Sequence, residues 1–134
     1  MRPPALDGKD WYNAKGPISW QDVQGNVVLV DFWATWCSPC MKKLPALQAL
    51  YEKFNGKGLV VIGVHSRDNA DKLPAFMDKH QISFPVVLDA GKTFENYGIE
   101  AVPSYVLIGK SGKVLRALTN DLPTESEIQE LLDK

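Results

Sequence analysis

The sequence predicts an α/β protein with a central, mixed but mainly parallel β-sheet and helices on both of its faces. Apolar runs of strand length recur at residues 27–33, 59–64, 86–88 and 104–108. Segments with the 3.6-residue period of amphipathic helices alternate with them. The first runs are apolar almost throughout, which is typical of strands that are covered on both faces.

Length and composition indicate a globular protein. We expect one domain over residues 1–134, with an irregular lead-in at 1–16 that is rich in proline, glycine and charge. The net charge of −1 gives no electrostatic reason to expect nucleic acid or an anionic membrane as a partner. No apolar stretch approaches the roughly 20 residues that span a bilayer, and the start lacks the pattern of a secretory signal.

The first half of the chain is expected to begin with a short helical turn at 20–23 that Ser19 caps, followed by a strand at 27–33. From Cys37 the period changes to that of a helix, which Gly56 and Gly58 end. Its inward stripe consists of Cys40, Leu44, Leu47, Tyr51 and Phe54.

The second half continues the alternation. We expect a strand at 59–64, a helix at 70–80, a strand at 86–88, a short helix at 93–97 and a strand at 104–108. The inward residues of the helix at 70–80 are Leu73, Phe76 and Met77. A turn at 110–113 and a strand at 114–118 would close a hairpin. Thr124 and Glu127 form a capping box that begins the last helix, which buries Ile128, Leu131 and Leu132.

Both cysteines of the protein lie in Trp-Cys-Ser-Pro-Cys at 36–40, directly behind a strand and at the start of a helix. A Cys-x-x-Cys pair at such a place can close a disulfide and open it again. Unpaired N–H groups and the helix dipole favour a thiolate at Cys37 and can lower its pKa from about 8.5 to between roughly 3.5 and 7.5. Cys37, at the first turn where it can remain accessible, is therefore the expected nucleophile, and Cys40, on the core face, would resolve the mixed disulfide.

Asp31 is the exception in an otherwise apolar strand. Its burial would raise the pKa of the carboxyl toward neutrality, so that it could take the proton from Cys40. The alternative is a structural acid that bonds to a nearby backbone group. Between the cysteines, Ser38 and Pro39 would set the strain of the loop, because the ring of Pro39 fixes φ in the first helical turn.

Three features together resemble one known superfamily. They are Val-Asp-Phe-Trp-Ala-Thr-Trp-Cys-Ser-Pro-Cys at 30–40, Pro45, and Val102-Pro103 ahead of a strand. The chain is similar to the thioredoxin superfamily from about residue 16 to its end. It resembles most the TlpA/ResA-like, AhpC/TSA-type branch of membrane-tethered or periplasmic thiol–disulfide oxidoreductases. The resemblance implies a thioredoxin-like fold, with an extra helix and strand within 68–89, before a cis-proline.

The resemblance also implies the remaining site residues. Pro103 matches the cis-proline that lies against the active-site disulfide, whereas the isolated sequence favours a trans proline at the start of a strand. The backbone of Val102 would then pair with the substrate. Pro45 matches a helix-kinking proline, and Asp31 matches the buried acid beneath the second cysteine. The expected substrate-binding residues are Trp36, Ser38, Pro39, Val102 and Pro103.

Two positions depart from that branch. Asp31 stands where many TlpA-like proteins carry Asn, and Lys43 stands where ResA-like proteins often carry Glu. A cation one turn after Cys40 would favour the thiolate rather than accept its proton. A redox partner therefore does not carry over from the ResA-like proteins.

The expected activity is exchange of the Cys37–Cys40 dithiol or disulfide with protein substrates. We expect a reductant of the cell redox homeostasis or cytochrome c maturation type. It would act as a monomer with a redox partner protein and without a cofactor, metal or nucleic acid. A periplasmic or other extracytoplasmic location is expected, with a membrane reached only through a tether absent from this chain; a cytoplasmic location is the alternative.

Two other functions remain open. A peroxiredoxin-like peroxidase shares the fold, but its Pro-x-x-x-Thr-x-x-Cys pattern meets Val30 and Ala34 here. A thioredoxin-like metal carrier or docking module is the other. A structural zinc site needs four ligands, and only His65 and His80 would add to the cysteines. Both histidines are expected to pack or cap rather than to act in catalysis.

Overall fold

The computed structural model describes residues 2–8 and 10–134. The elements follow the expected alternation of strands and helices. In chain order they are β1 (Trp11–Tyr12), β2 (Val27–Trp33), α1 (Ser38–Phe54), β3 (Leu59–His65), the 3₁₀ turn η1 (Ala70–Lys72), α2 (Leu73–Lys79), β4 (Val86–Leu88), α3 (Thr93–Asn96), β5 (Ser104–Ile108), β6 (Val114–Thr119) and α4 (Glu125–Asp133).

The strands of the described residues form one mixed sheet in the order β1-β4-β3-β2-β5-β6. β2, β3 and β4 run parallel, whereas β5 is antiparallel to β2, and β1 and β6 are antiparallel to the strands beside them. β2 pairs along its whole length with β3, from Val27 opposite Leu59 to Trp33 opposite His65. The expected mixed central sheet is confirmed, with Asp31 on its inner strand β2, but the sheet is not mainly parallel, because β1, β5 and β6 each pair antiparallel with their neighbours.

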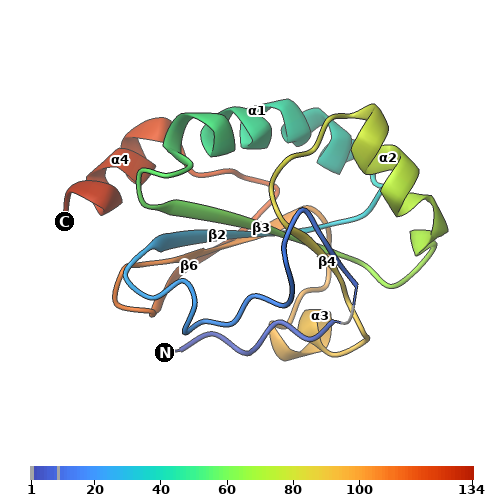
Figure 1. Cartoon of the computed structure of the whole chain (residues 1–134), viewed down its shortest axis with the longest axis horizontal. Coiled ribbons are helices and arrows are strands. Elements are labelled where there is room, and N and C mark those ends of the chain that lie inside the picture. The colour runs from blue at the N-terminus through green and yellow to red at the C-terminus, as the bar shows by residue number, and fades with distance from the viewer. Residues whose placement is uncertain (1, 9) are drawn as a thin grey trace.

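Helices cover both faces of the sheet, as expected. Figure 1 shows α1, α2 and α4 on one side of it, and α3 with the N-terminal segment on the other. The alternation of β2 divides its side chains between the two layers. Leu29 and Trp33 pack with the core face of α1, and Val30 and Phe32 pack with the layer that includes Phe94 of α3.

The helix ends follow from local chemistry. Pro39 stands in the first turn of α1, where its missing N–H costs no helical bond. The Thr124 side chain accepts from the Glu127 N–H, and the Glu127 carboxylate accepts from the Thr124 N–H, so the capping box of α4 is confirmed. Pro45 lies inside α1, as expected.

Two local expectations were wrong. The lead-in at 1–16 contains β1, which pairs with β4 through Trp11 opposite Val87. A two-residue strand is too short to give a period, and only its partner reveals it. The segment 20–23 forms hydrogen-bonded turns and no helix, because the N–H groups of Asp22 and Asn26 each close a single turn, to the carbonyls of Ser19 and Val23. The expected cap is present, since Ser19 Oγ accepts from the Asp22 N–H at 3.3 Å.

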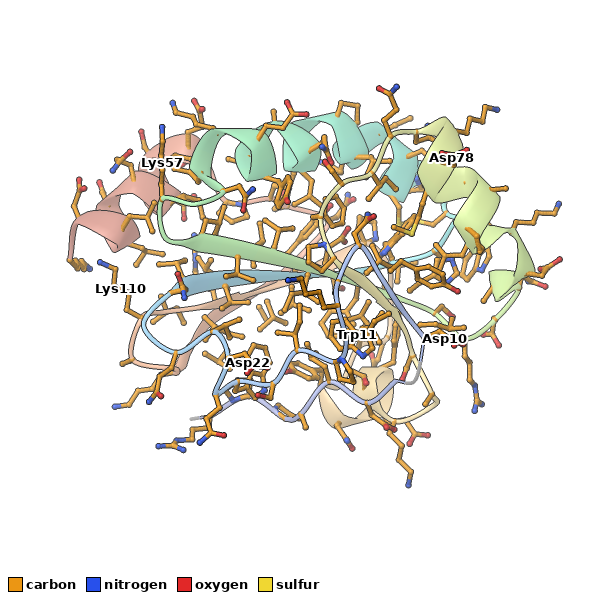
Figure 2. The ribbon with its side chains drawn as sticks, in the orientation of Figure 1. Asp10, Trp11, Asp22, Lys57, Asp78 and Lys110 are labelled. Carbon is orange, nitrogen blue, oxygen red and sulfur yellow. A yellow bond between two sulfur atoms is a disulfide. The ribbon has the colours of Figure 1, made fainter. Side chains whose placement is uncertain are left out.

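Charged side chains lie at the surface of the molecule, whereas apolar side chains pack against the sheet. Figure 2 shows Trp11 directed inward beneath the sheet, whereas Lys57, Asp78 and Lys110 project from the surface. Trp11 packs with the layer around Phe32. The lead-in thus covers a face of the sheet that α3, only four residues long, leaves open.

Candidate active site

The cysteine pair lies where β2 passes into α1. Cys37 is the N-cap of α1, with φ −94° and ψ 107°, and its Sγ accepts from the Cys40 backbone N–H at 3.2 Å. The Cys40 N–H, one of the N–H groups that the first helical turn leaves without an intrahelical partner, is therefore directed at the Cys37 sulfur. This arrangement stabilises a thiolate at Cys37 when the pair is reduced.

The two cysteines form a disulfide with a Cα–Cα distance of 5.3 Å. Each residue is 5% exposed, so the disulfide form does not show the expected contrast between an accessible Cys37 and a buried Cys40. The bond is the physical reason, because it ties Cys37 to a side chain on the core face of α1. Ser38 and Pro39, between them, are exposed.

Asp31 lies on the same face of β2 as Leu29 and Trp33, and thus on the side that α1 covers. It is 4% exposed, and burial raises the pKa of its carboxyl from 3.8 to about 8. Its Oδ1 has no hydrogen-bond partner among the described residues. The alternative of a carboxylate satisfied by backbone N–H groups finds no support at this oxygen.

Two neighbours define the surroundings of Asp31. Gly63 of β3 and Tyr105 of β5 are its register partners. Burial, and then the charge of Asp31, raise the pKa of Tyr105 above its usual range. A Cβ at Gly63 would lie 2.9 Å from Trp33 Nε1, which is also buried and without a partner in the described part of the chain. Asp31 thus lies in a tightly packed apolar space where its neutral form is favoured at pH 7.

The Val102–Pro103 peptide bond is cis, as the resemblance implied. Pro103 immediately precedes β5, whose first residue, Ser104, lies opposite Phe32 near the end of β2. Register therefore brings Pro103 to the sheet end from which the cysteine loop departs. Ser104 Oγ donates to the Ala101 carbonyl at 2.6 Å, and the Asn120 N–H donates to the Pro103 carbonyl at 2.9 Å.

Trp36 is the exposed aromatic residue beside the disulfide. It is 55% exposed, and its Nε1 donates to the Asp68 carbonyl at 3.2 Å. Val102 is half-buried and contacts the apolar core that includes both cysteines. The expected substrate-binding residues thus come to one end of the sheet, and Trp36 gives that end an apolar outer surface.

Sequence reasoning set aside one residue that the structure brings to the site. His65, at the end of β3, is fully buried and lies edge-to-face with Trp33, with ring centroids 5.1 Å apart. Its Nε2 accepts from the Thr35 backbone N–H at 2.9 Å, two residues before Cys37. Nothing in the local sequence indicates this contact, because it depends on the parallel register of β2 and β3.

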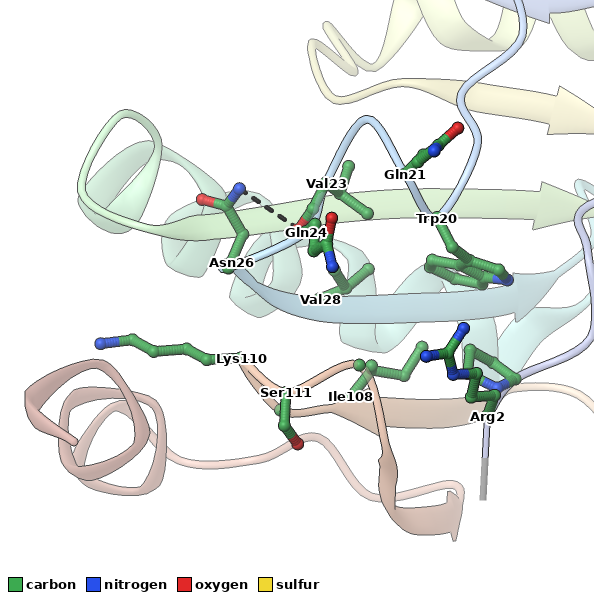
Figure 3. A pocket seen from close by; sticks show the side chains of 14 residues that line it. Arg2, Trp20, Gln21, Val23, Gln24, Asn26, Val28, Ile108, Lys110 and Ser111 are labelled. Atoms are coloured by element: carbon green, nitrogen blue, oxygen red, sulfur yellow. Dashed lines mark hydrogen bonds between the residues drawn. The ribbon is translucent and has the colours of Figure 1, made fainter.

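Other features lie away from this chemistry. A cavity of about 280 Å³ lies at the opposite end of the sheet, between Trp20, Val28, Ile108 and Arg2 (Figure 3). In the parts of the chain that are described, no helix is long and apolar enough to cross a membrane. Lys43, by contrast, lies near the cysteines, one turn after Cys40 on α1, and is half-buried.

The comparisons with known proteins agree with this geometry. The model of the AhpC/TSA family matches residues 4–117, which is most of the chain. The chain belongs to the AhpC/TSA family. Thiol-disulfide oxidoreductase ResA of Bacillus thuringiensis subsp. konkukian is 32% identical to this family member over 118 residues, covering 87% of the chain and 68% of the relative. The ResA protein of Bacillus subtilis is 32% identical over 117 residues, covering 87% and 65%.

Solved structures share the fold of this AhpC/TSA family member. A thiol-disulfide isomerase from Corynebacterium glutamicum has a TM-score of 0.86 and 26% identity, over 98% of this chain and 97% of that one. A thioredoxin-like superfamily protein has a TM-score of 0.89 and 26% identity, over 100% and 97%. The protein is thus a TlpA/ResA-like member of the thioredoxin superfamily and a protein-disulfide oxidoreductase. It spans about two thirds of the length of the ResA relatives.

Proposed function

We propose that this oxidoreductase reduces disulfides of protein substrates outside the cytoplasm, in cell redox homeostasis or cytochrome c maturation. The observation that carries the proposal is the Cys37–Cys40 disulfide at the N-terminus of α1, on the face of the sheet that holds a buried Asp31. Similarity to the thiol-disulfide oxidoreductases named ResA supports the exchange chemistry and the extracytoplasmic location. A redox partner protein would return the disulfide to the dithiol.

The first step of the reaction belongs to Cys37. Its thiolate attacks one sulfur of the substrate disulfide, and the other substrate sulfur leaves as a thiolate that takes a proton from water. The enzyme is then joined to the substrate through Cys37. The Cys40 N–H and the N-terminal end of α1 favour the thiolate that this attack needs, because that N–H donates to the Cys37 sulfur.

The second step belongs to Cys40 and Asp31. In the carboxylate form of Asp31, which is the minor form at pH 7 and grows as the pH approaches 8, the Cys40 thiol passes its proton to Asp31 and attacks the Cys37 sulfur, which releases the second substrate thiolate. Two electrons have then passed to the substrate, and the enzyme holds the disulfide. A pKa of about 8 suits Asp31 to this transfer, because it matches the basicity of a thiol far better than an exposed carboxyl does.

The substrate is expected to lie across Trp36, Ser38 and Pro39 on one side and Val102 and Pro103 on the other. Trp36 offers exposed apolar area. The hydrogen bonds at the cis-proline turn use the carbonyls of Ala101 and Pro103, so the backbone groups of Val102 stay outside those two bonds. An extended substrate segment could pair with them as with the edge of a sheet.

A trapping experiment tests the division of roles. Cys40→Ser should accumulate substrate proteins covalently on Cys37, and these should be released by dithiothreitol and identified by mass spectrometry. Cys37→Ser is the matched control, and it should trap none. Equal trapping by both variants, or by neither, contradicts the assigned roles.

The direction of transfer is tested separately. Equilibration of the Cys37–Cys40 couple with glutathione should give a potential near that of thioredoxin, about −270 mV, whereas a value near −120 mV would make the protein an oxidant. The peroxidase alternative is tested on the same samples. Peroxide consumption that survives Cys40→Ser would favour it, and its absence together with insulin reduction favours the oxidoreductase.

A further inference from the structure

We propose that His65 is a positioning residue for Cys37: its neutral imidazole holds the Thr35 N–H and fixes the loop that presents the nucleophile. The inference deepens the proposed function and rests on it, because it concerns the same thiol. It assigns a role to a buried titratable side chain that the two-step mechanism leaves unused. The residue acts through the backbone and touches no reacting atom.

The hydrogen bonds of His65 define its tautomer. Nδ1 lies 2.5 Å from the Ser66 carbonyl, which can only accept, so Nδ1 carries the proton. Nε2 is then unprotonated and accepts from the Thr35 N–H at 2.9 Å. Each ring nitrogen is used once, in the direction that only the neutral Nδ1–H tautomer allows.

The contact is one of three hydrogen bonds among the described residues that join the chain leaving β2 to the chain leaving β3. In the other two, the Ser66 N–H donates to the Trp33 carbonyl at 2.9 Å, and Trp36 Nε1 donates to the Asp68 carbonyl. Trp33 and His65 are register partners, so the imidazole is placed beside the loop by the sheet itself. Only Trp36 separates the held Thr35 from Cys37, which leaves little backbone freedom between the anchor and the sulfur.

The geometry of Cys37 depends on this loop. The Cys37 N–H donates to the Ala34 carbonyl at 3.1 Å, and the Cys40 N–H donates to Cys37 Sγ at 3.2 Å. Movement of this loop would change the contact between the Cys40 N–H and Cys37 Sγ, which favours the thiolate. Loss of the His65 acceptor should therefore appear as a raised pKa of the Cys37 thiol.

The surroundings favour the neutral imidazole. The charged and titratable groups on the elements around it are Asp31 on the same face of β2, the cysteines, Arg67 and Asp68 after β3, and Asp89, whose N–H donates to the His65 carbonyl at 2.9 Å. Among the described ion pairs none involves His65. The Asp89 carboxylate is taken up by the N–H groups of residues 91–94. Burial lowers the pKa of His65, with the Ser66 bond opposing it.

The test compares variants that differ in the acceptor. His65→Gln keeps an oxygen that can accept from Thr35, whereas His65→Leu has a similar volume and no acceptor. His80→Leu is the matched control, because His80 is the other histidine of the chain and is exposed. The rate of iodoacetamide alkylation is measured against pH in a Cys40→Ser background, where it reports the Cys37 thiol alone.

We expect His65→Leu to raise the Cys37 pKa by about one unit, which slows alkylation about tenfold below the wild-type pKa. His65→Gln should stay close to wild type, and His80→Leu should match it. A wild-type profile for His65→Leu overturns the proposal. So does an equal shift in His65→Leu and His65→Gln.

A second measurement needs no variant and stays decisive if His65→Leu does not fold. The imidazole ¹⁵N shifts of the labelled wild-type protein should show a neutral Nδ1–H tautomer from pH 8 to pH 5.5. An Nε2–H tautomer or an imidazolium in that range overturns the proposal. Absent insulin reduction with the expected tautomer and alkylation profiles would instead contradict the proposed function and leave the positioning role intact.

Discussion

Replacing Asp31 by Asn should stabilise the protein, and the gain should grow with pH. The carboxyl has a pKa of about 8 in the folded protein against 3.8 for an exposed one, so folding binds a proton over that interval. Folded-state stability is therefore greatest below pH 3.8 and falls as pH rises toward 8. Asn has nearly the same shape and no charge, so it removes this pH dependence.

The magnitude follows from the pKa interval. One pH unit between the two pKa values corresponds to about 1.4 kcal/mol. Asp31→Asn should thus gain about 2 kcal/mol in the free energy of unfolding at pH 5 and about 4 at pH 7. The gain in the free energy of unfolding should level off at about 6 kcal/mol above pH 8 and vanish near pH 4.

Urea unfolding of the oxidised protein, followed by tryptophan fluorescence at pH 4, 5, 7 and 9, measures this gain. Asp89→Asn is the matched control, because Asp89 is also 4% exposed but accepts four backbone N–H bonds. Loss of the Asp89 carboxylate in this variant should destabilise the protein by about 1–3 kcal/mol at pH 7. A gain for Asp31→Asn that does not change with pH, or a loss at pH 9, refutes the reasoning.

Three further changes have distinct expected outcomes. Trp36→Ala should leave the urea midpoint almost unchanged but slow insulin reduction several-fold, because an exposed contact surface is lost; equal rates would remove Trp36 from the substrate surface. Gly63→Ala should destabilise by about 1–3 kcal/mol, because the new methyl meets Trp33 Nε1 at 2.9 Å and Phe84 at 3.1 Å; a neutral result in the same urea assay contradicts that packing. Thr124→Ala should cost about 1 kcal/mol through loss of the α4 cap, and Thr124→Ser, assayed in parallel, should retain most of it.

Much of the fold could be predicted because its signals are local. The bounds of the strand at 27–33 were predicted correctly, since an almost continuous apolar run between Asn26 and a turn leaves little choice of where the strand begins and ends. The capping box placed the start of α4, and the position of the cysteines placed the start of α1. β1 could not be predicted, because two residues become a strand only when β4 lies beside them.

The candidate site divides in the same way. Sequence alone determined the chemistry on offer: a cysteine pair at a helix start, an aspartate among apolar neighbours and a proline before a strand. Tertiary structure decided the burial of Cys37 within its disulfide and the contact of His65 with Thr35. It also decided that Oδ1 of Asp31 has no hydrogen-bond partner among the described residues. The physical reason is that the type of each residue is given by the chain, and its local conformation depends mainly on its covalent neighbours. Solvent access and hydrogen-bond partners depend instead on strands that meet only after the chain has folded.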